Sequence, residues 1–310
     1  MPVFLPMAAT GWSASCRSIN SYGRPMSSFL PRSSRVELCG DRFARPLIVG
    51  RLQALRELRS MKRRLAFLFL VAGLCATAPA IAAPFDNWAA IVVAADNRAA
   101  SGAPTEVFDN ARRDIANALA GIGFTAHNIQ QYSTQPENDL ITNPLPANPL
   151  SIYNSMYKLS QEANAGCFVY ITTHGAPLGI TMGKDLITQR TVGDIIDRSC
   201  IGRPTVIVVS ACYSGMFIPV IRADNRFIFT AARADRTSFG CAEDLQYTYF
   251  DQCFLESMPM ASDFVTLAAK TTECVAKREV IEGATPPSEP QVYIGATVGP
   301  TLPAFGAPGT

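Results

Sequence analysis

The chain has 310 residues and is 48% hydrophobic, which is enough for one sizeable domain or two small ones. Its formal charge of +2 hides an uneven distribution, because residues 1–83 hold 12 of the 27 Lys and Arg but only 3 of the 25 Asp and Glu. The remaining residues hold 15 basic and 22 acidic side chains, a net charge of −7. Nucleic-acid binding needs a basic surface, so this balance excludes nucleic acid as the expected partner.

The basic stretch ends in a segment that is typical of a secretory signal peptide, residues 61–83. Met61-Lys62-Arg63-Arg64 is a positive start, residues 65–74 form an apolar core, and small residues follow. Ala80-Ile81-Ala82 fits an A-x-A site, so we expect cleavage near Ala82-Ala83 and a periplasmic or secreted protein. The apolar core is too short for a permanent membrane span. A buried core helix is the alternative interpretation.

The position of this leader divides the rest of the chain. Because an export signal must begin a protein, we expect residues 1–60 to be a non-native upstream extension, with Met61 as the true start. A disordered tail is the alternative for 1–60. We expect a single domain over 84–298 and a flexible tail, rich in Pro and Gly, over 299–310.

Apolar strands alternate with helices along the expected domain. The predicted strands are 88–95, 125–131, 167–173, 204–210, 226–231 and 291–297. The predicted helices are 104–121, 151–162 (capped by Ser151), 191–198 (capped near Thr191) and 263–277, with a proline-rich loop at 144–150 and a small hairpin at 179–186. This α/β alternation predicts a mostly parallel six-stranded sheet with helices on both faces.

Two of the predicted strands end on a reactive side chain near a glycine. His174 lies at the end of the run Val169–Gly175, and Cys212 lies near the end of the run Val206–Gly215. Open α/β sheets bind their ligands at the carboxyl ends of the strands, so both side chains are delivered to the edge where chemistry occurs. A lone His or a lone buried Cys is usually structural. The matched placement of a thiol and an imidazole instead favours nucleophilic acyl transfer.

Four ordered segments resemble the legumain family of cysteine peptidases, peptidase family C13, in the caspase-like clan. They are the His174-Gly175 strand end, Ala211-Cys212-Tyr213-Ser214-Gly215, residues 230–241 and Tyr247-Thr248-Tyr249-Phe250. The resemblance covers residues 88–255. It implies a caspase-like three-layer sandwich and an exported thiol protease, a hydrolase acting on peptide or protein substrates without a cofactor.

The resemblance also implies roles at the strand ends. Cys212 would be the nucleophile of an endopeptidase that works through an acyl-enzyme, and His174 the general base or proton donor. The oxyanion hole would be the backbone N–H groups of Gly175 and Cys212. The sequence identifies no third orienting group. A transamidase or ligase with the same dyad, and a catalytically silent binding protein on the same fold, are the alternatives.

The same resemblance implies a set of substrate-binding residues: Asp109, Asn110, Ser210, Thr237, Ser238 and Asp251. In the family, an Arg-His doublet and an acidic residue select asparagine or aspartate at the cleavage position. Here the nearest match to the doublet is Asp109-Asn110, and Asp251 or Gln252 stands at the acidic position. Ser210 stands where legumains have Glu. These departures argue against an asparagine preference, and two aspartates would favour a basic side chain. Solvated loop residues are the alternative for Asp109, Asp251 and Thr237.

Six cysteines remain after leader cleavage: Cys167, Cys200, Cys212, Cys241, Cys253 and Cys274. Most of them are expected to pair in an oxidising compartment. If Cys212 stays free, at least one more stays unpaired or pairs between chains, and Cys241–Cys253 is a plausible short loop. With no CxxC and two histidines, of which His127 is expected on the surface, we expect no metal site.

Overall fold

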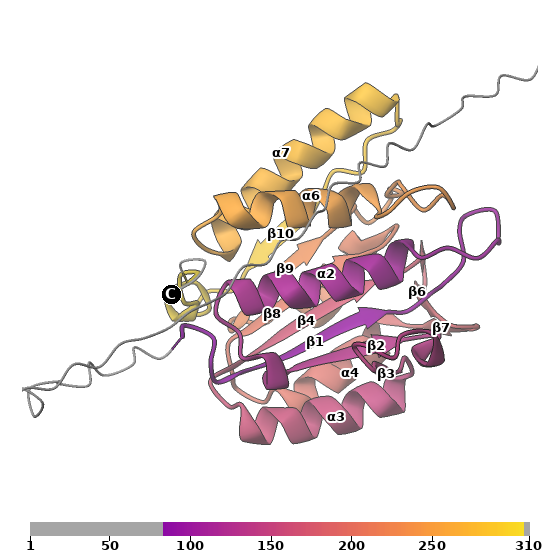
Figure 1. Ribbon diagram of the computed structural model, residues 1–310. Helices are drawn as coiled ribbons and strands as arrows, with labels where there is room; N and C mark the ends of the chain where they lie inside the picture. Colours follow the sequence, from indigo (N-terminus) through magenta and orange to yellow (C-terminus); the bar gives the residue numbers. More distant parts are fainter. Residues whose placement is uncertain (1–82, 307–310) are drawn as a thin grey trace, which may run out of the picture. The chain divides into compact units, whose positions relative to one another are not determined.

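A computed structural model describes residues 83–306 of the chain (Figure 1). The expected extension 1–60, the leader up to residue 82 and the last residues of the tail lie outside the described residues. Within residues 83–306, no helix combines the length and the apolar character that crossing a bilayer requires.

A seven-stranded sheet forms the centre of the fold, with the strand order β10-β9-β8-β4-β1-β2-β3. The strands are β1 (Trp88–Ala94), β2 (Ile129–Ser133), β3 (Leu145–Pro146), β4 (Gly166–Thr172), β8 (Thr205–Ser210), β9 (Arg226–Thr230) and β10 (Gln291–Ile294). All neighbours are parallel except β9 and β10, which are antiparallel. A separate three-stranded sheet follows β4 and consists of β5 (Gly175–Ala176), β6 (Gly179–Met182) and β7 (Asp185–Ile187).

The central strands owe their position to their continuous apolar sequences. Every residue of β1, β4 and β8 is buried, as a parallel sheet covered on both faces requires. Side chains alternate across the sheet, so Ala90 and Val92 of β1 enter one hydrophobic core while Ile91 and Val93 enter the other. The predicted runs of β-branched residues therefore build two cores at once.

Helices cover both faces of this sheet, as Figure 1 shows. One face carries α2 (Val107–Gly121), α6 (Tyr249–Ser257) and α7 (Phe264–Glu282), and the other carries α3 (Pro149–Glu162), α4 (Gln189–Ser199) and α5 (Ile218–Ile221). Short 3₁₀ turns lie at Ala126–Asn128, Pro136–Asn138, Ser214–Phe217, Met258–Met260 and Gly299–Thr301. The predicted three-layer, mostly parallel architecture is confirmed.

Several element boundaries differ from the sequence prediction. The sheet has a seventh strand, because two residues of the predicted proline-rich loop, Leu145 and Pro146, pair with the end of β2. Helix α3 begins at Pro149 and is capped by Asn148, whose side chain accepts the Ser151 N–H, so Ser151 is not the cap. Proline is favourable in the first turn because its missing N–H is not needed there.

The cysteine pairing corrects the sequence prediction. Cys167 on β4 is bonded to Cys200 at the end of α4, and Cys253 on α6 is bonded to Cys274 on α7. The suggested Cys241–Cys253 bridge is therefore wrong, because Cys253 faces the neighbouring helix. Cys212 and Cys241 are the free cysteines among the described residues.

Candidate active site

His174 stands just beyond the carboxyl end of β4. The strand ends at Thr172, and the next N–H, that of Thr173, donates to the Ser210 carbonyl of β8 at 3.1 Å. The pairing of β4 with β8 thus continues to the residue before His174. The side chain of His174 lies beyond the ladder and is half-buried.

Cys212 occupies the matching position after β8. The residue that follows it, Tyr213, has a φ of +57°, a left-handed backbone conformation that residues other than glycine rarely adopt. The Tyr213 N–H donates to the Arg236 carbonyl at 2.7 Å and holds this turn in place. The chain therefore leaves the strand abruptly at Cys212, and the thiol remains half-buried at the sheet rim.

The backbones at the two strand ends are in direct contact. A Cβ atom added to Gly175 would lie 1.9 Å from the Cys212 carbonyl oxygen. Only a residue without a side chain fits there, which explains the glycine after His174. The structure thus places the residue after His174 against the backbone of Cys212 at the rim of the sheet.

The imidazole of His174 is oriented by a backbone carbonyl. Its Nε2 lies 2.7 Å from the Arg98 oxygen, which can only accept, so Nε2 carries the proton and Nδ1 is left as the basic nitrogen. The edge-to-face contact with Phe108, with ring centroids 5.2 Å apart, fixes the ring from another side. Sequence reasoning missed this third group, because a carbonyl is common to every residue and leaves no motif.

A buried carboxylate, that of Asp96, holds Arg98 and hence this carbonyl. Asp96 accepts both Arg98 guanidinium bonds at 2.9 Å, together with the Asn97 N–H at 2.8 Å. Arg98 also donates to the Gly183 carbonyl at 2.6 Å. Burial on its own raises the pKa of Asp96, but the hydrogen bonds from Arg98 and Asn97 outweigh it and hold that pKa below its usual value. Asp96 is thus ionised, and the loop after β1 is fixed.

The sulfur of Cys212 faces the segment after β9. The Ser238 N–H donates to Sγ at 3.3 Å, and the Ser238 hydroxyl lies 3.7 Å from the sulfur. The Cys212 thiol also donates to the Ser238 carbonyl at 3.5 Å, so the backbone of Ser238 contacts the sulfur with both a donor and an acceptor. Of the two expected serine-pair positions, Ser238 therefore contacts the thiol, while Thr237 is half-buried beside it.

Asp109 and Asn110, the nearest match to the family's Arg-His doublet, form hydrogen bonds within the protein. The Asp109 carboxylate accepts from Arg112 at 2.8 Å and from the Ser133 hydroxyl at 2.9 Å. The Asn110 amide donates to the Gln246 carbonyl at 3.1 Å. Asp109 is buried on α2 next to the end of β2, and its negative charge is neutralised there.

Asp251 and Ser210 lie beneath the rim. Both are buried, and Asp251 is fully inaccessible in the first turn of α6. Its carboxylate accepts from the Tyr170 and Thr172 hydroxyls of β4. The Ser210 hydroxyl lies 3.4 Å from that of Thr248, the cap of α6. His127, expected on the surface, is exposed in the turn before β2.

The second free cysteine, Cys241, lies near this site. It packs, half-buried, against Val107 and Phe108, and Phe108 is the ring that contacts His174. Burial raises the pKa of the Cys241 thiol, with a smaller contribution from Cys212. A raised pKa keeps this thiol protonated and makes it a poorer nucleophile.

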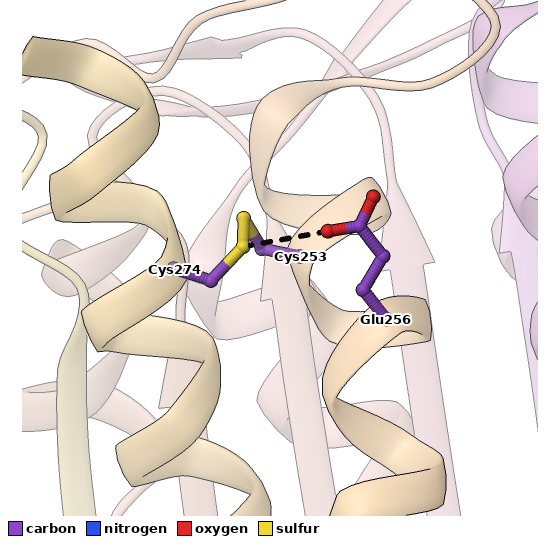
Figure 2. A group of neighbouring side chains, drawn as sticks. All are labelled: Cys253, Glu256 and Cys274. Atoms are coloured by element: carbon purple, nitrogen blue, oxygen red, sulfur yellow. Dashed lines mark hydrogen bonds between the residues drawn. A yellow bond between two sulfur atoms is a disulfide. The ribbon is translucent and has the colours of Figure 1, made fainter. Parts of the chain in front are cut away.

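One group of described side chains gathers metal-ligating residue types, Cys253, Glu256 and Cys274 (Figure 2). The carboxylate of Glu256 lies 3.8 Å from the Cys274 sulfur. Both sulfurs belong to the α6–α7 disulfide, however, and a metal ion needs free thiolates. In this oxidised state the group is a structural crosslink.

Comparison with solved structures defines the class of protein. The crystal structure of caspase-1 from Spodoptera frugiperda matches with a TM-score of 0.53 at 14% identity, covering 76% of this chain and 96% of that one. The fold is therefore caspase-like. A model of the peptidase C13 family matches residues 104–296. Because this match spans more than half of the chain, the protein belongs to the peptidase C13 family and is a hydrolase of the cysteine peptidase type. No curated protein sequence matches this chain.

Proposed function

We propose that the protein is an exported cysteine endopeptidase in which Cys212 and His174 form the catalytic dyad. The observation that carries this proposal is the contact between Gly175 and the Cys212 carbonyl, which joins the two reactive strand ends. The hydrogen bond from Nε2 of His174 to the Arg98 carbonyl also supports the proposal, because it leaves Nδ1 without a proton and available as the base.

The proposed reaction uses these groups in sequence. Nδ1 of His174 takes the proton of the Cys212 thiol, and the resulting thiolate attacks the peptide carbonyl carbon while the backbone N–H groups of Gly175 and Cys212 stabilise the oxyanion. His174, protonated at Nδ1, gives this proton to the leaving amine. Water then attacks the thioester while Nδ1 of His174 takes a proton from it. The C–S bond breaks to release the acid product, and His174 returns this proton to the Cys212 sulfur.

The substrate-binding residues named from the sequence support a narrower proposal. Ser238 and Thr237 form the pocket wall beside the thiol, since Ser238 contacts Sγ. The carboxylates of Asp109 and Asp251 serve internal partners instead, so we propose that neither provides a charge for a basic substrate side chain.

The export proposal rests on the leader pattern of residues 61–83, with its basic start, apolar core and A-x-A site. Protein secreted or released from the periplasm is expected to begin at or next to Ala83. Amino-terminal sequencing checks this, and any native peptide from residues 1–60 would show that the expected upstream extension belongs to the protein.

A digest of a peptide library by the protein that starts near Ala83 tests the proposed activity. We expect internal peptide bonds to be cleaved by the parent and by Cys241→Ala, and no cleavage by Cys212→Ala. His174→Ala is expected to lower kcat by at least about 100-fold, the lower end of the general acid–base contribution. A Cys212→Ala variant that still cleaves would disprove the dyad. An added amine that appears in the products would identify the transamidase alternative.

A further inference from the structure

A fully buried carboxylate, that of Asp251, lies beneath the proposed dyad without a role in the reaction derived above. Its relative exposure is 0%, and it sits in the first turn of α6. The Tyr170 hydroxyl donates to one carboxylate oxygen at 2.7 Å, and the Thr172 hydroxyl donates to the other at 2.6 Å. Both oxygens thus bind residues of β4.

The partners of Asp251 are unusual for a buried acid. None of the ion pairs found between residues 83 and 306 includes Asp251, so hydroxyl groups rather than a cation satisfy it. An ionisable group without a charged partner is costly to bury, and its hydrogen bonds must compensate. Burial raises the pKa of Asp251, while the hydroxyl donors, Thr172 first among them, oppose this rise.

The same network reaches the second reactive strand. The Asp251 N–H donates to the Thr248 hydroxyl at 3.1 Å, and this hydroxyl lies 3.4 Å from that of Ser210 on β8. Thr172 and Ser210 face each other in the β4–β8 ladder. Thr172 lies two residues before His174, and Ser210 lies two residues before Cys212. The network therefore contacts both strands immediately before their reactive residues.

We propose that Asp251 is a positioning residue, which ties the ends of β4 and β8 to the start of α6 and thereby fixes the spacing of His174 and Cys212. This inference rests on the proposed peptidase function. Asp251 does not touch the sulfur or the imidazole, and it acts only through the two strand ends. A displacement of about 1 Å between reacting groups can cost about 100-fold in rate, so a tie at this point bears directly on kcat.

The test compares Asp251→Ala with a control that weakens the fold elsewhere. Phe227→Leu truncates a fully buried ring on β9 that packs against Phe264 and makes none of the hydrogen bonds of this network. We expect Asp251→Ala to lower kcat by about 10-fold or more and to change KM by less than about twofold, because positioning acts on the chemical step. Phe227→Leu is expected to lower the melting temperature and to keep kcat.

A second measurement separates this inference from the proposed function. The rate at which iodoacetamide alkylates Cys212 is followed in the parent, in Asp251→Ala and in Phe227→Leu. The proposed function fails if the parent does not hydrolyse peptides, or if it hydrolyses them without needing Cys212. If the parent hydrolyses peptides through Cys212, but Asp251→Ala keeps both its kcat and its alkylation rate, the positioning role is overturned.

A milder variant keeps the inference testable if Asp251→Ala does not fold. The double variant Thr172→Val/Ser210→Ala removes one hydroxyl from each strand end at nearly constant shape and leaves Asp251 in place. We expect this variant to lose kcat while its KM stays within about twofold of the parent value. An unchanged kcat in the folded double variant would contradict the proposal as directly as an unchanged Asp251→Ala.

Discussion

Gly175 is the residue with the least freedom at the site. Its added Cβ would lie 1.9 Å from the Cys212 carbonyl, far inside van der Waals contact, and the neighbour is backbone that cannot turn away. We expect Gly175→Ala to cost about 1–3 kcal/mol of unfolding free energy, as overpacking does, and to lower kcat/KM by about 100-fold through displacement of the strand ends.

Urea unfolding and peptide hydrolysis measure both effects. Gly121→Ala is the matched control, because a Cβ at this helical glycine of α2 meets nothing within 4 Å. The control is expected to gain up to about 1 kcal/mol of stability at unchanged activity. Full activity in Gly175→Ala would mean that the two strand ends need not touch.

The Asp96–Arg98 pair makes a prediction about acid pH. Because the pKa of Asp96 is lowered in the folded state, its stabilisation is present above the unfolded pKa of about 3.9 and is lost as the pH falls through the folded value. We expect Asp96→Asn to lose about 1–3 kcal/mol of stability at pH 7, a moderate figure because Arg98 is half-exposed.

Urea unfolding of the parent and Asp96→Asn at pH 7 and near pH 3 measures this change. The difference between the two proteins should shrink at the lower pH, because the unfolded parent then takes up a proton at Asp96 that the folded carboxylate resists. Asp96→Asn should also hydrolyse peptides more slowly, since the Arg98 carbonyl that binds His174 is less firmly held. A stability difference that is the same at both pH values would rule out the ionised carboxylate as its source.

Among the elements, α6 decides how the site is built. Its sequence carries a start signal, Thr248 followed three residues later by Asp251, with Phe250 and Phe254 at helical spacing. Asp251 was predicted to bind substrate instead, so this helix start was not identified. In the structure Thr248 caps the helix, and Asp251, in its first turn, turns toward β4.

The disulfide between α6 and α7 is the main covalent support of this element. A bridge across 21 residues stabilises by about 3 kcal/mol in the chain-entropy account. We expect the double variant Cys253→Ala/Cys274→Ala to lose about that much in urea unfolding. Cys241→Ala, which removes a free thiol, is expected to stay within about 0.5 kcal/mol of the parent. Equal stability of the double variant and the parent would show that packing alone fixes α6.

At the scale of the whole molecule, one disulfide reinforces each core. Cys167–Cys200 belongs to the core beneath α3 and α4, and Cys253 belongs to the core beneath α6 and α7. Cys167 and Cys200 are each at most 3% exposed, whereas Cys274 of the second bridge is half-buried, as Cys212 is at the rim. A reductant in solution therefore reaches Cys212 and the α6–α7 bridge before it reaches Cys167–Cys200.

This difference predicts two separate effects of dithiothreitol. Mild treatment of the folded protein should keep Cys212 reduced and active and leave Cys167–Cys200 intact, because access governs thiol–disulfide exchange. Treatment during unfolding should reduce both bridges and lower the melting temperature after refolding. Mass spectrometry of alkylated samples counts the free thiols at each step. Loss of Cys167–Cys200 under mild conditions would contradict its burial.

Much of the fold follows from local patterns in the sequence. The β-branched runs of β1, β4 and β8 specify strands buried on both faces, and their alternation with helices specifies a parallel three-layer sheet. The order of four motifs indicated the family. The positions of Cys212 and His174 after adjacent strands could also be predicted, since strand ends of a parallel sheet share one edge.

Other features depend on residues far apart in the chain, and only the tertiary structure decides them. The Arg98 carbonyl beneath His174, the hydroxyl partners of Asp251 and the pairing of Cys253 with Cys274 have no local signature. The physical reason is that repeat spacing records which face of an element is apolar. It does not record which backbone carbonyl, hydroxyl or thiol the packing of two elements will bring within a bond length of each other.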